Sequence, residues 1–370
     1  MQRILRAKLK KKKMKISEKI KAKKDKKSET ITQQNIEESR EKIISKGKKF
    51  KYPFQYAKHR LMINAILIGV VAVGTFALVG WYQLYKAQNT GEVMYRFTRS
   101  MGLSVASVDG VKVRFSDYLM LYRSSIASVE RQQGAFDDSD ASKQQKEYYK
   151  RQALNAAEDY SFAMAKLDEA GKSVTEEEID EIIEEHKTID GEKRSDEAFE
   201  GIIRDNFGLS VKEYRRWIML SLAKKKASME FDQDAKKLRD EIATSLKVVN
   251  NFGDLMKNYE GNDQVGFEVV EDVDYANLDS GRAAAAAKLQ NVGDMTDFFV
   301  SKNGDGYYIV KLLNKTDTKV SYASIWVRFK WVDDQMAKLR EGGKVIERID
   351  LATQDTNEEE ATDSENTEEK

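Results

Sequence analysis

The chain has 370 residues, a single proline, two histidines and no cysteine, which excludes disulfide bonds, cysteine nucleophiles and a lipid-modified cysteine anchor in this sequence. Its net charge of +1 conceals a strong asymmetry, because residues 1–60 contain 22 Lys and Arg against 6 Asp and Glu. The first 60 residues therefore carry about +16 and the rest about −15, so the acidic remainder does not have the charge of a domain that binds nucleic acid or anionic membranes.

Residues 1–60 form a lysine-rich arm that cannot bury an apolar core. We predict that this arm is cytoplasmic and disordered or transiently helical. Basic residues near an anionic membrane surface each contribute ~1 kcal/mol of attraction, so membrane lipids are its expected partner. Binding to RNA or ribosomes is an alternative that no aromatic stacking pattern supports, so nucleic acid is not an expected partner.

Residues 61–85 read LMINAILIGVVAVGTFALVGWYQLY and carry no charge. Because about 20 helical residues span the ~30 Å hydrocarbon core, this stretch predicts a single transmembrane helix. The excess of positive charge before it places the N-terminus in the cytoplasm and everything after residue 85 outside, in a single-pass protein of the cell membrane. A buried helix of a soluble protein is the alternative, and apolar residues on every face argue against it. The predicted anchor residues include Leu61, Ile66, Val71, Phe76, Trp81 and Tyr82.

Residues 86–102 are predicted to be a short stalk, and residues 103–233 a helical domain. Alternating apolar residues around Asp109-Gly110 predict a hairpin with a type I′ turn. A long helix is expected over residues 143–170. Two later helices begin with the spacing of a capping box, Ser173 with Glu176 and Ser210 with Glu213.

The motifs VASVDGVKV–S–DYLMLY, VTEEEID and FGLSVKEYRRWI occur in this order over about 130 residues. Together they resemble the N-terminal chaperone domain of extracytoplasmic foldases of the SurA, PrsA and PpiD type. The resemblance implies a helical domain that binds polypeptides. It also implies that a C-terminal segment, predicted here as a helix over residues 332–351, packs back on that domain. The remaining residues, 352–370, form an acidic tail that we expect to be disordered.

Residues 234–331 resemble the parvulin prolyl-isomerase module. The resemblance rests on four segments: a helix over residues 234–259 that ends FGDLMKNY, a Gly-Phe strand at residues 266–267, the segment AKLQNVGDMT and a GYYIV strand. Parvulins begin with a strand that often reads A-x-HIL, and no such strand precedes residue 234. The strand VSYASIWVRF at residues 320–329 is a candidate to fill that position in the sheet, or it is simply the extended last strand.

The resemblance also implies where catalytic residues would lie, and the sequence departs from the pattern there. Tyr308 replaces the histidine of the GYHII motif, and Ser324 replaces that of A-x-HIL. The helix that supplies large pocket residues reads RAAAAA at residues 282–287. The remaining outer histidine, His186, is expected to be a solvated residue on an acidic helix. No paired-histidine metal spacing and no phosphate-binding loop is present, so no metal or cofactor is expected.

The sequence thus predicts an α+β protein: one transmembrane helix, a SurA-like helical chaperone domain and a small parvulin-like domain without confident catalytic residues. We expect a membrane-anchored chaperone that binds unfolded or newly exported polypeptides in an apolar, acid-rimmed cleft between the two domains. An active prolyl isomerase that uses Tyr308 and Ser324 is one alternative, and an envelope scaffold with a fixed partner is another. The sequence does not reveal the oligomeric state. The predicted peptide-binding residues are Phe298, Phe299, Tyr307, Tyr308, Tyr322 and Trp326.

Overall fold

The computed structural model describes residues 14–18, 33–51, 60–189, 192–249, 251–275, 277 and 279–351. The chain divides into two compact units, Met1–Leu78 and Val79–Lys370. In the basic arm the helix α2 spans Gln33–Lys51, and much of the rest of the arm lies outside the described residues. The predicted acidic tail, residues 352–370, also lies outside them.

The predicted apolar helix is present as α3, Arg60–Trp81, followed by a π-helical turn at Tyr82–Lys86. The segment is long and apolar enough to cross a membrane, and its most apolar window buries nothing against the protein. All six predicted anchor side chains are more than half exposed, from 51% for Trp81 to 88% for Leu61.

The prediction of a separate stalk over residues 86–102 is wrong. These residues include the helix α4, Glu92–Met101, whose Tyr95 and Thr98 are buried in the following domain. Leu84, just before it, is also fully buried, and the Tyr85 hydroxyl donates a hydrogen bond to the carbonyl oxygen of Ser104 at 2.9 Å. The folded domain therefore begins at the end of the apolar helix.

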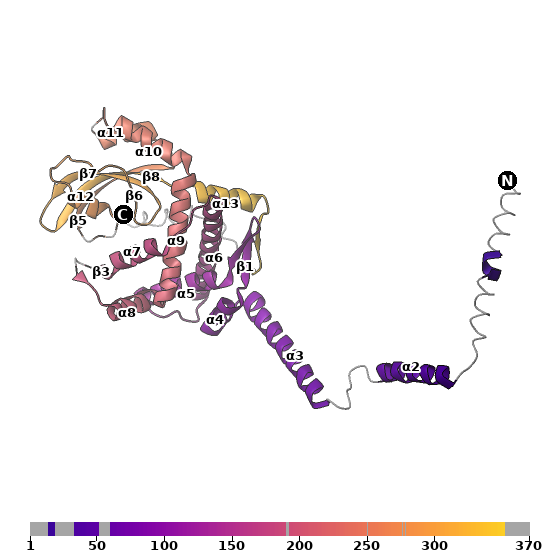
Figure 1. Cartoon of the computed structure of the whole chain (residues 1–370). Helices are drawn as coiled ribbons and strands as arrows, with labels where there is room; N and C mark the ends of the chain where they lie inside the picture. Colours follow the sequence, from indigo (N-terminus) through magenta and orange to yellow (C-terminus); the bar gives the residue numbers. More distant parts are fainter. Residues whose placement is uncertain are drawn as a thin grey trace, which may run out of the picture. The chain divides into compact units, whose positions relative to one another are not determined.

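The predicted hairpin is confirmed, with β1 at Ser104–Val108, β2 at Val111–Arg114, and positive φ angles at Asp109 and Gly110. A helical array follows, in which α9 packs along α6 (Figure 1). Its helices are α5 Phe115–Gln133, α6 Asp140–Glu169, α7 Glu176–Lys187, α8 Asp196–Phe207 and α9 Val211–Phe231. Two paired strands of two residues each lie between α7 and α8, namely β3 Thr188–Ile189 and β4 Glu192–Lys193.

One of the two predicted capping boxes is correct. Ser210 and Glu213 cap α9 reciprocally, as expected. The box of α7, however, is formed by Thr175 and Glu178, two residues later than predicted. Both Ser-x-x-Glu and Thr-x-x-Glu fit the spacing in this stretch, and the later start places Ile179 and Ile183 on one buried face of the helix.

The C-terminal segment does pack back on the helical domain, but the predicted helix over residues 332–351 is wrong. Helix α13 covers Trp331–Glu341 and ends at Gly342, and Gly343 then adopts a positive φ of 64°. The chain continues as the strand β9, Val345–Glu347, which pairs antiparallel with β1 and gives a sheet of order β2-β1-β9. Ile349 and Leu351 then enter the core of the helical domain.

The second domain begins with α10, Gln233–Ser245, and α11, Phe252–Met256, with a 3-10 turn at Lys257–Tyr259. The single helix predicted over residues 234–259 is therefore interrupted. A four-stranded antiparallel sheet follows, in the order β5-β8-β7-β6. Its strands are β5 Val265–Asp274, β6 Phe299–Val300, β7 Gly306–Lys315 and β8 Lys319–Arg328.

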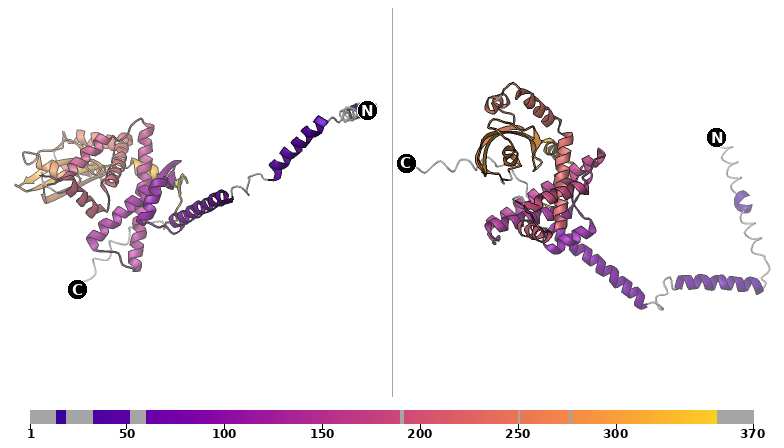
Figure 2. Two further views of the ribbon diagram at one scale, coloured as in Figure 1. Left: turned by 60° about the horizontal axis from the view of Figure 1, so that its bottom comes forward. Right: turned by 60° about the vertical axis from the view of Figure 1, so that its left-hand side comes forward.

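The sheet separates two small cores. Helices α10 and α11 cover one face, where Ile242, Phe252 and Leu255 pack on Ile309 and Ile325. The six-residue helix α12, Arg282–Ala287, covers the other face, and the sheet curves around it (Figure 2). The α+β class predicted from the sequence is thus confirmed.

Candidate functional site

Tyr308 and Ser324, which stand where the parvulin pattern has histidines, lie on the same face of the sheet. In the register of β7 and β8, Tyr308 lies opposite Trp326, Val310 opposite Ser324, and Leu312 opposite Tyr322. Residues directly opposite one another on adjacent strands point to the same side. This is the side that α12 covers, and we refer to it as the α12 face.

Arg282, the first residue of α12, contacts side chains from three strands on the α12 face. One Nη of its guanidinium forms an ion pair with Glu268 of β5 and lies 3.5 Å from the hydroxyl oxygen of Ser324. The guanidinium carbon lies 5.4 Å from the ring centroid of Tyr308 and 5.9 Å from that of Tyr322. We call these five residues the arginine cluster.

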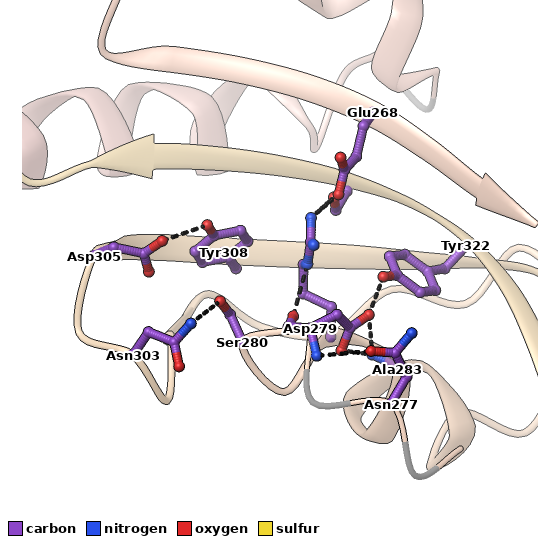
Figure 3. Close-up of polar contacts among 11 residues, drawn as sticks. Glu268, Asn277, Asp279, Ser280, Ala283, Asn303, Asp305, Tyr308 and Tyr322 are labelled. Carbon is purple, nitrogen blue, oxygen red and sulfur yellow. Dashed lines mark hydrogen bonds and ion pairs between the residues drawn. The ribbon is translucent and has the colours of Figure 1, made fainter. Parts of the chain in front are cut away.

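The two tyrosine hydroxyls of the arginine cluster donate to carboxylates. Tyr308 donates to Asp305 at 3.1 Å, and Tyr322 donates to Asp279 (Figure 3). Asp279 also accepts the backbone N–H of Ala283 at 2.9 Å and so caps the start of α12. Burial, with a smaller contribution from Asp305, raises the pKa of Tyr308 to about 12.

Burial also raises the pKa of Tyr322, and Ser324 is fully buried. The two phenol groups are therefore protonated near neutral pH, and each donates a hydrogen bond to a carboxylate, Asp305 or Asp279. Glu268 lies directly opposite Ser324 in the register of β5 and β8, and the Arg282 guanidinium contacts both side chains. The arginine cluster thus forms a polar core between α12 and the sheet.

Beside the cluster, three aromatic side chains form a row across the sheet. The ring of Tyr308 is stacked between those of Phe299 and Trp326, at centroid distances of 6.3 and 6.5 Å. The indole of Trp326 lies directly over Gly266 of β5, where an added Cβ would come within 2.1 Å of the ring. Phe299 and Trp326 are partly exposed, so this row presents an apolar edge to solvent.

The structure separates the six predicted peptide-binding residues. Phe299, Tyr308, Tyr322 and Trp326 lie on the α12 face, but Tyr322 is fully buried beneath α12. Tyr307 points to the opposite face, where it packs edge-on against Phe329. Phe298 belongs to the same core as Tyr307. Phe299, Tyr308 and Trp326 are thus the candidates that remain together.

Sequence reasoning missed the charged members of this site. Asp279 and Arg282 come from one segment at the start of α12, whereas Glu268 comes from β5 and lies beside Arg282 only in the fold. One signal was available, because the alternation of the strand VGFEVV places Glu268 on the same side as Gly266 and Val270. His186, by contrast, is an exposed residue in the helical domain, and its Nδ1 lies 2.9 Å from the Tyr214 hydroxyl.

Polar contacts join the two domains of the second unit. Lys302 forms an ion pair with Glu185 of α7, and the Asp232 carboxylate accepts the backbone N–H groups of Lys330 and Trp331 at 2.8 and 3.1 Å. An open groove of about 860 Å³ lies elsewhere, along α10, and is lined mainly by charged and polar side chains. The predicted cleft between the domains stays a prediction.

One known family model matches the helical part of the chain. The family model described as the SurA-like N-terminal domain matches residues 54–228, from before α3 to near the end of α9. This supports the SurA-like resemblance and is consistent with a chaperone-type folding protein that acts outside the cytoplasm. The match stops before the four-stranded sheet. No curated protein and no solved structure matches the chain.

Proposed function

We propose that this chain, with its SurA-like helical domain, is a membrane-anchored chaperone that binds unfolded or newly exported polypeptides and lacks prolyl-isomerase chemistry. The SurA-like match supports the binding of polypeptide clients. The apolar helix α3 supports membrane attachment, and the charge asymmetry around it favours a cytoplasmic arm with the folded domains outside.

The observation that carries the absence of isomerase chemistry is the arginine cluster. Rotation about a peptide bond has a barrier of about 18–20 kcal/mol, and a catalyst must stabilise the twisted amide in a pocket that accepts the proline ring. Here a guanidinium paired with Glu268 lies on the α12 face, above the buried Ser324. A proline ring could enter only by displacing this ion pair, whose partial burial makes separation costly.

The order of the sheet supports the parvulin-like assignment of the second domain. Strand β8 lies in the interior, between the Gly-Phe strand β5 and the GYYIV strand β7. If β8 lay at the sheet edge, far from β7, it could not fill the position of the missing first strand. We therefore propose a parvulin-like sheet in which that strand is supplied from the end of the domain.

For client binding we propose the row Phe299–Tyr308–Trp326. Aromatic rings offer a large apolar contact area and lose little conformational entropy on binding, which suits weak and sequence-tolerant recognition. The acidic balance of the residues outside the arm keeps such a chaperone soluble when client-free and favours basic or neutral segments.

The test uses the full-length chain in lipid nanodiscs and measures two activities side by side. One is suppression of the aggregation of an unfolded client, and the other is the rate of a proline-limited refolding reaction. We expect suppression without acceleration. Trp326→Ala should weaken suppression, whereas Val292→Ala, at another exposed apolar residue, should not.

Acceleration of refolding that is lost in Tyr308→Phe would refute the proposal in favour of an isomerase. Absence of both activities, together with crosslinking to a single partner, would favour an envelope scaffold instead.

A further inference from the structure

The exposed side of α4 has a composition that the helical fold does not explain. Val93, Phe97 and Met101 are spaced by four residues and therefore lie along one side of the helix. Val93 is 73% exposed and Met101 is 60% exposed, although the neighbouring Tyr95 and Thr98 are buried. An apolar stripe with both ends in solvent, on a helix whose other side fills a core, indicates a further contact.

The middle of this stripe touches the last turn of α3. A Cβ added at Gly80 would lie 3.2 Å from ring carbons of Phe97, so the absence of a side chain at Gly80 allows α4 to approach closely. Gly80 is followed at once by the exposed aromatic residues Trp81 and Tyr82. Aromatic rings of this kind favour the headgroup level of a membrane. Through its contact with Gly80, α4 lies at the height of these two residues.

Basic side chains surround the stripe. Lys86, Arg96 and Arg99 are exposed, and Glu92 is the acidic residue of this helix. Glu92 is already neutralised, because it pairs with Arg96 at 2.7 Å and also with Arg123. Within the described part of the chain, Lys86 and Arg99 enter no ion pair. An otherwise acidic domain thus has a local surface that is apolar in its centre and basic around it.

We propose that α4 is an interfacial helix that lies on the outer surface of the same bilayer that α3 crosses. Val93 and Met101 enter the headgroup region, and Arg96, Arg99 and Lys86 contact lipid phosphates. An apolar stripe flanked by cations that reach toward phosphates is the pattern of helices that lie in the plane of the interface. The occupant is a membrane rather than a second protein because the stripe continues from the domain-side end of the apolar helix.

The consequence concerns the orientation of the chaperone domain. With both α3 and α4 in contact with the bilayer, the helical domain is fixed at two points and holds one side toward the membrane. This inference rests on the proposed membrane anchoring by α3, and the experiment below separates the two.

The natural absence of cysteine allows single-site labelling of the full-length chain. Val93→Cys and Met101→Cys are each labelled with an environment-sensitive fluorophore in nanodiscs that contain headgroup-level spin-labelled lipid. Val292→Cys, also exposed but in the sheet domain, is the matched control. Val71→Cys, read with a quencher deep in the acyl chains, reports insertion of α3. We expect quenching at residues 71, 93 and 101 and none at residue 292.

Charge is tested by comparing neutral nanodiscs with nanodiscs that contain anionic lipid. Each basic side chain near an anionic surface favours contact by about fivefold, so Arg96→Gln with Arg99→Gln should largely remove the stronger quenching at residue 93 in anionic lipid. Quenching at residue 71 without quenching at residues 93 and 101 would overturn the interfacial helix and leave the anchor intact. Absence of quenching at residue 71 would overturn both. Equal quenching at residue 292 would show non-specific adsorption and would also overturn the inference.

Discussion

At the scale of single residues, the packing of the sheet domain depends on the residues that lie on the α12 face. Arg282 forms an ion pair with Glu268, approaches Ser324 and lies near two tyrosine rings, so one residue contacts side chains from three strands. Gly266 has the opposite role, because its missing side chain makes room for the indole of Trp326. Both residues affect the aromatic row that we propose as a client surface.

Gly266→Ala should destabilise the sheet domain by about 1–3 kcal/mol, because the added methyl group overlaps the Trp326 ring and forces it to move. Urea unfolding followed by tryptophan emission measures this loss. Gly201→Ala is the matched control, since Gly201 lies within α8 and an added Cβ would make only an ordinary contact, 3.9 Å from the Arg204 guanidinium. Alanine there should stabilise the chain by about 0.5–1 kcal/mol. An unchanged unfolding midpoint for Gly266→Ala would contradict the close approach.

Glu158 of α6 predicts a pH dependence of stability. The residue is fully buried, its Oε2 accepts from Arg340 at 2.9 Å, and its Oε1 has no hydrogen-bond partner. Burial raises its pKa from 4.5 to about 7. The folded state therefore retains a proton that the unfolded state releases, and stability contributed by this group falls as pH rises from about 4.5 to 7.

Glu158→Gln should remove this dependence. Relative to the variant, the unmodified chain should lose up to about 3 kcal/mol between pH 5 and pH 8, as measured by denaturant unfolding at the two pH values. Glu169→Gln, on the exposed end of the same helix, is the control. Its unfolding free energy should change between the two pH values by as much as that of the unmodified chain. A difference of the opposite sign would show that Glu158 is ionised in the fold.

At the scale of elements, the C-terminal segment completes the helical domain. Strand β9 extends the β1–β2 hairpin, and Arg151 of α6 holds it through Glu347 at 2.6 Å and through the carbonyl oxygen of Leu351 at 2.7 Å. The sheet domain is thus inserted between two parts of the chain that fold together. Helical-domain stability therefore depends on residues far along the sequence.

Arg151→Met should cost about 3–5 kcal/mol, because it leaves Glu347 and a buried carbonyl without their partner. Thermal unfolding followed by circular dichroism measures the loss. Lys344→Ala removes the surface pair with Asp109 near the same strand and should cost no more than about 1 kcal/mol. Similar losses for the two variants would argue against docking through Arg151.

At the scale of the whole molecule, the folded domain begins where the apolar helix ends. Leu84 and Tyr95 are buried with the hairpin and with α5, so the region between helix and domain is part of the core. Residues 84–101 therefore belong to the folded domain and do not form a separate linker.

A soluble fragment that begins at residue 79 should therefore be more stable than one that begins at residue 103, by at least about 3 kcal/mol, since the shorter fragment loses the buried side chains of Leu84 and Tyr95. Urea unfolding of the two fragments under the same conditions measures the difference. Equal midpoints would restore the idea of an independent stalk.

The sequence alone determined those features that depend on neighbouring residues. The apolar run of α3, the Asp109-Gly110 turn and the capping box of α9 were all predictable, because each follows from local hydrophobicity, from backbone angles or from a spacing of three residues. Even there, the cap of α7 was shifted by two residues, since two hydroxyl residues offered the same local spacing.

Only the tertiary structure decided the features that join distant segments. The pairing of β9 with β1, the packing of α4 on Gly80 and the position of Arg282 over Ser324 bring together residues that are not adjacent in sequence. Local propensity carries no information about such partners, because strand register and side-chain pairing are fixed by the burial of whole faces. For this reason the sequence indicated Tyr308 and Ser324 as positions of interest, whereas the structure revealed that Arg282 and Glu268 lie beside Ser324.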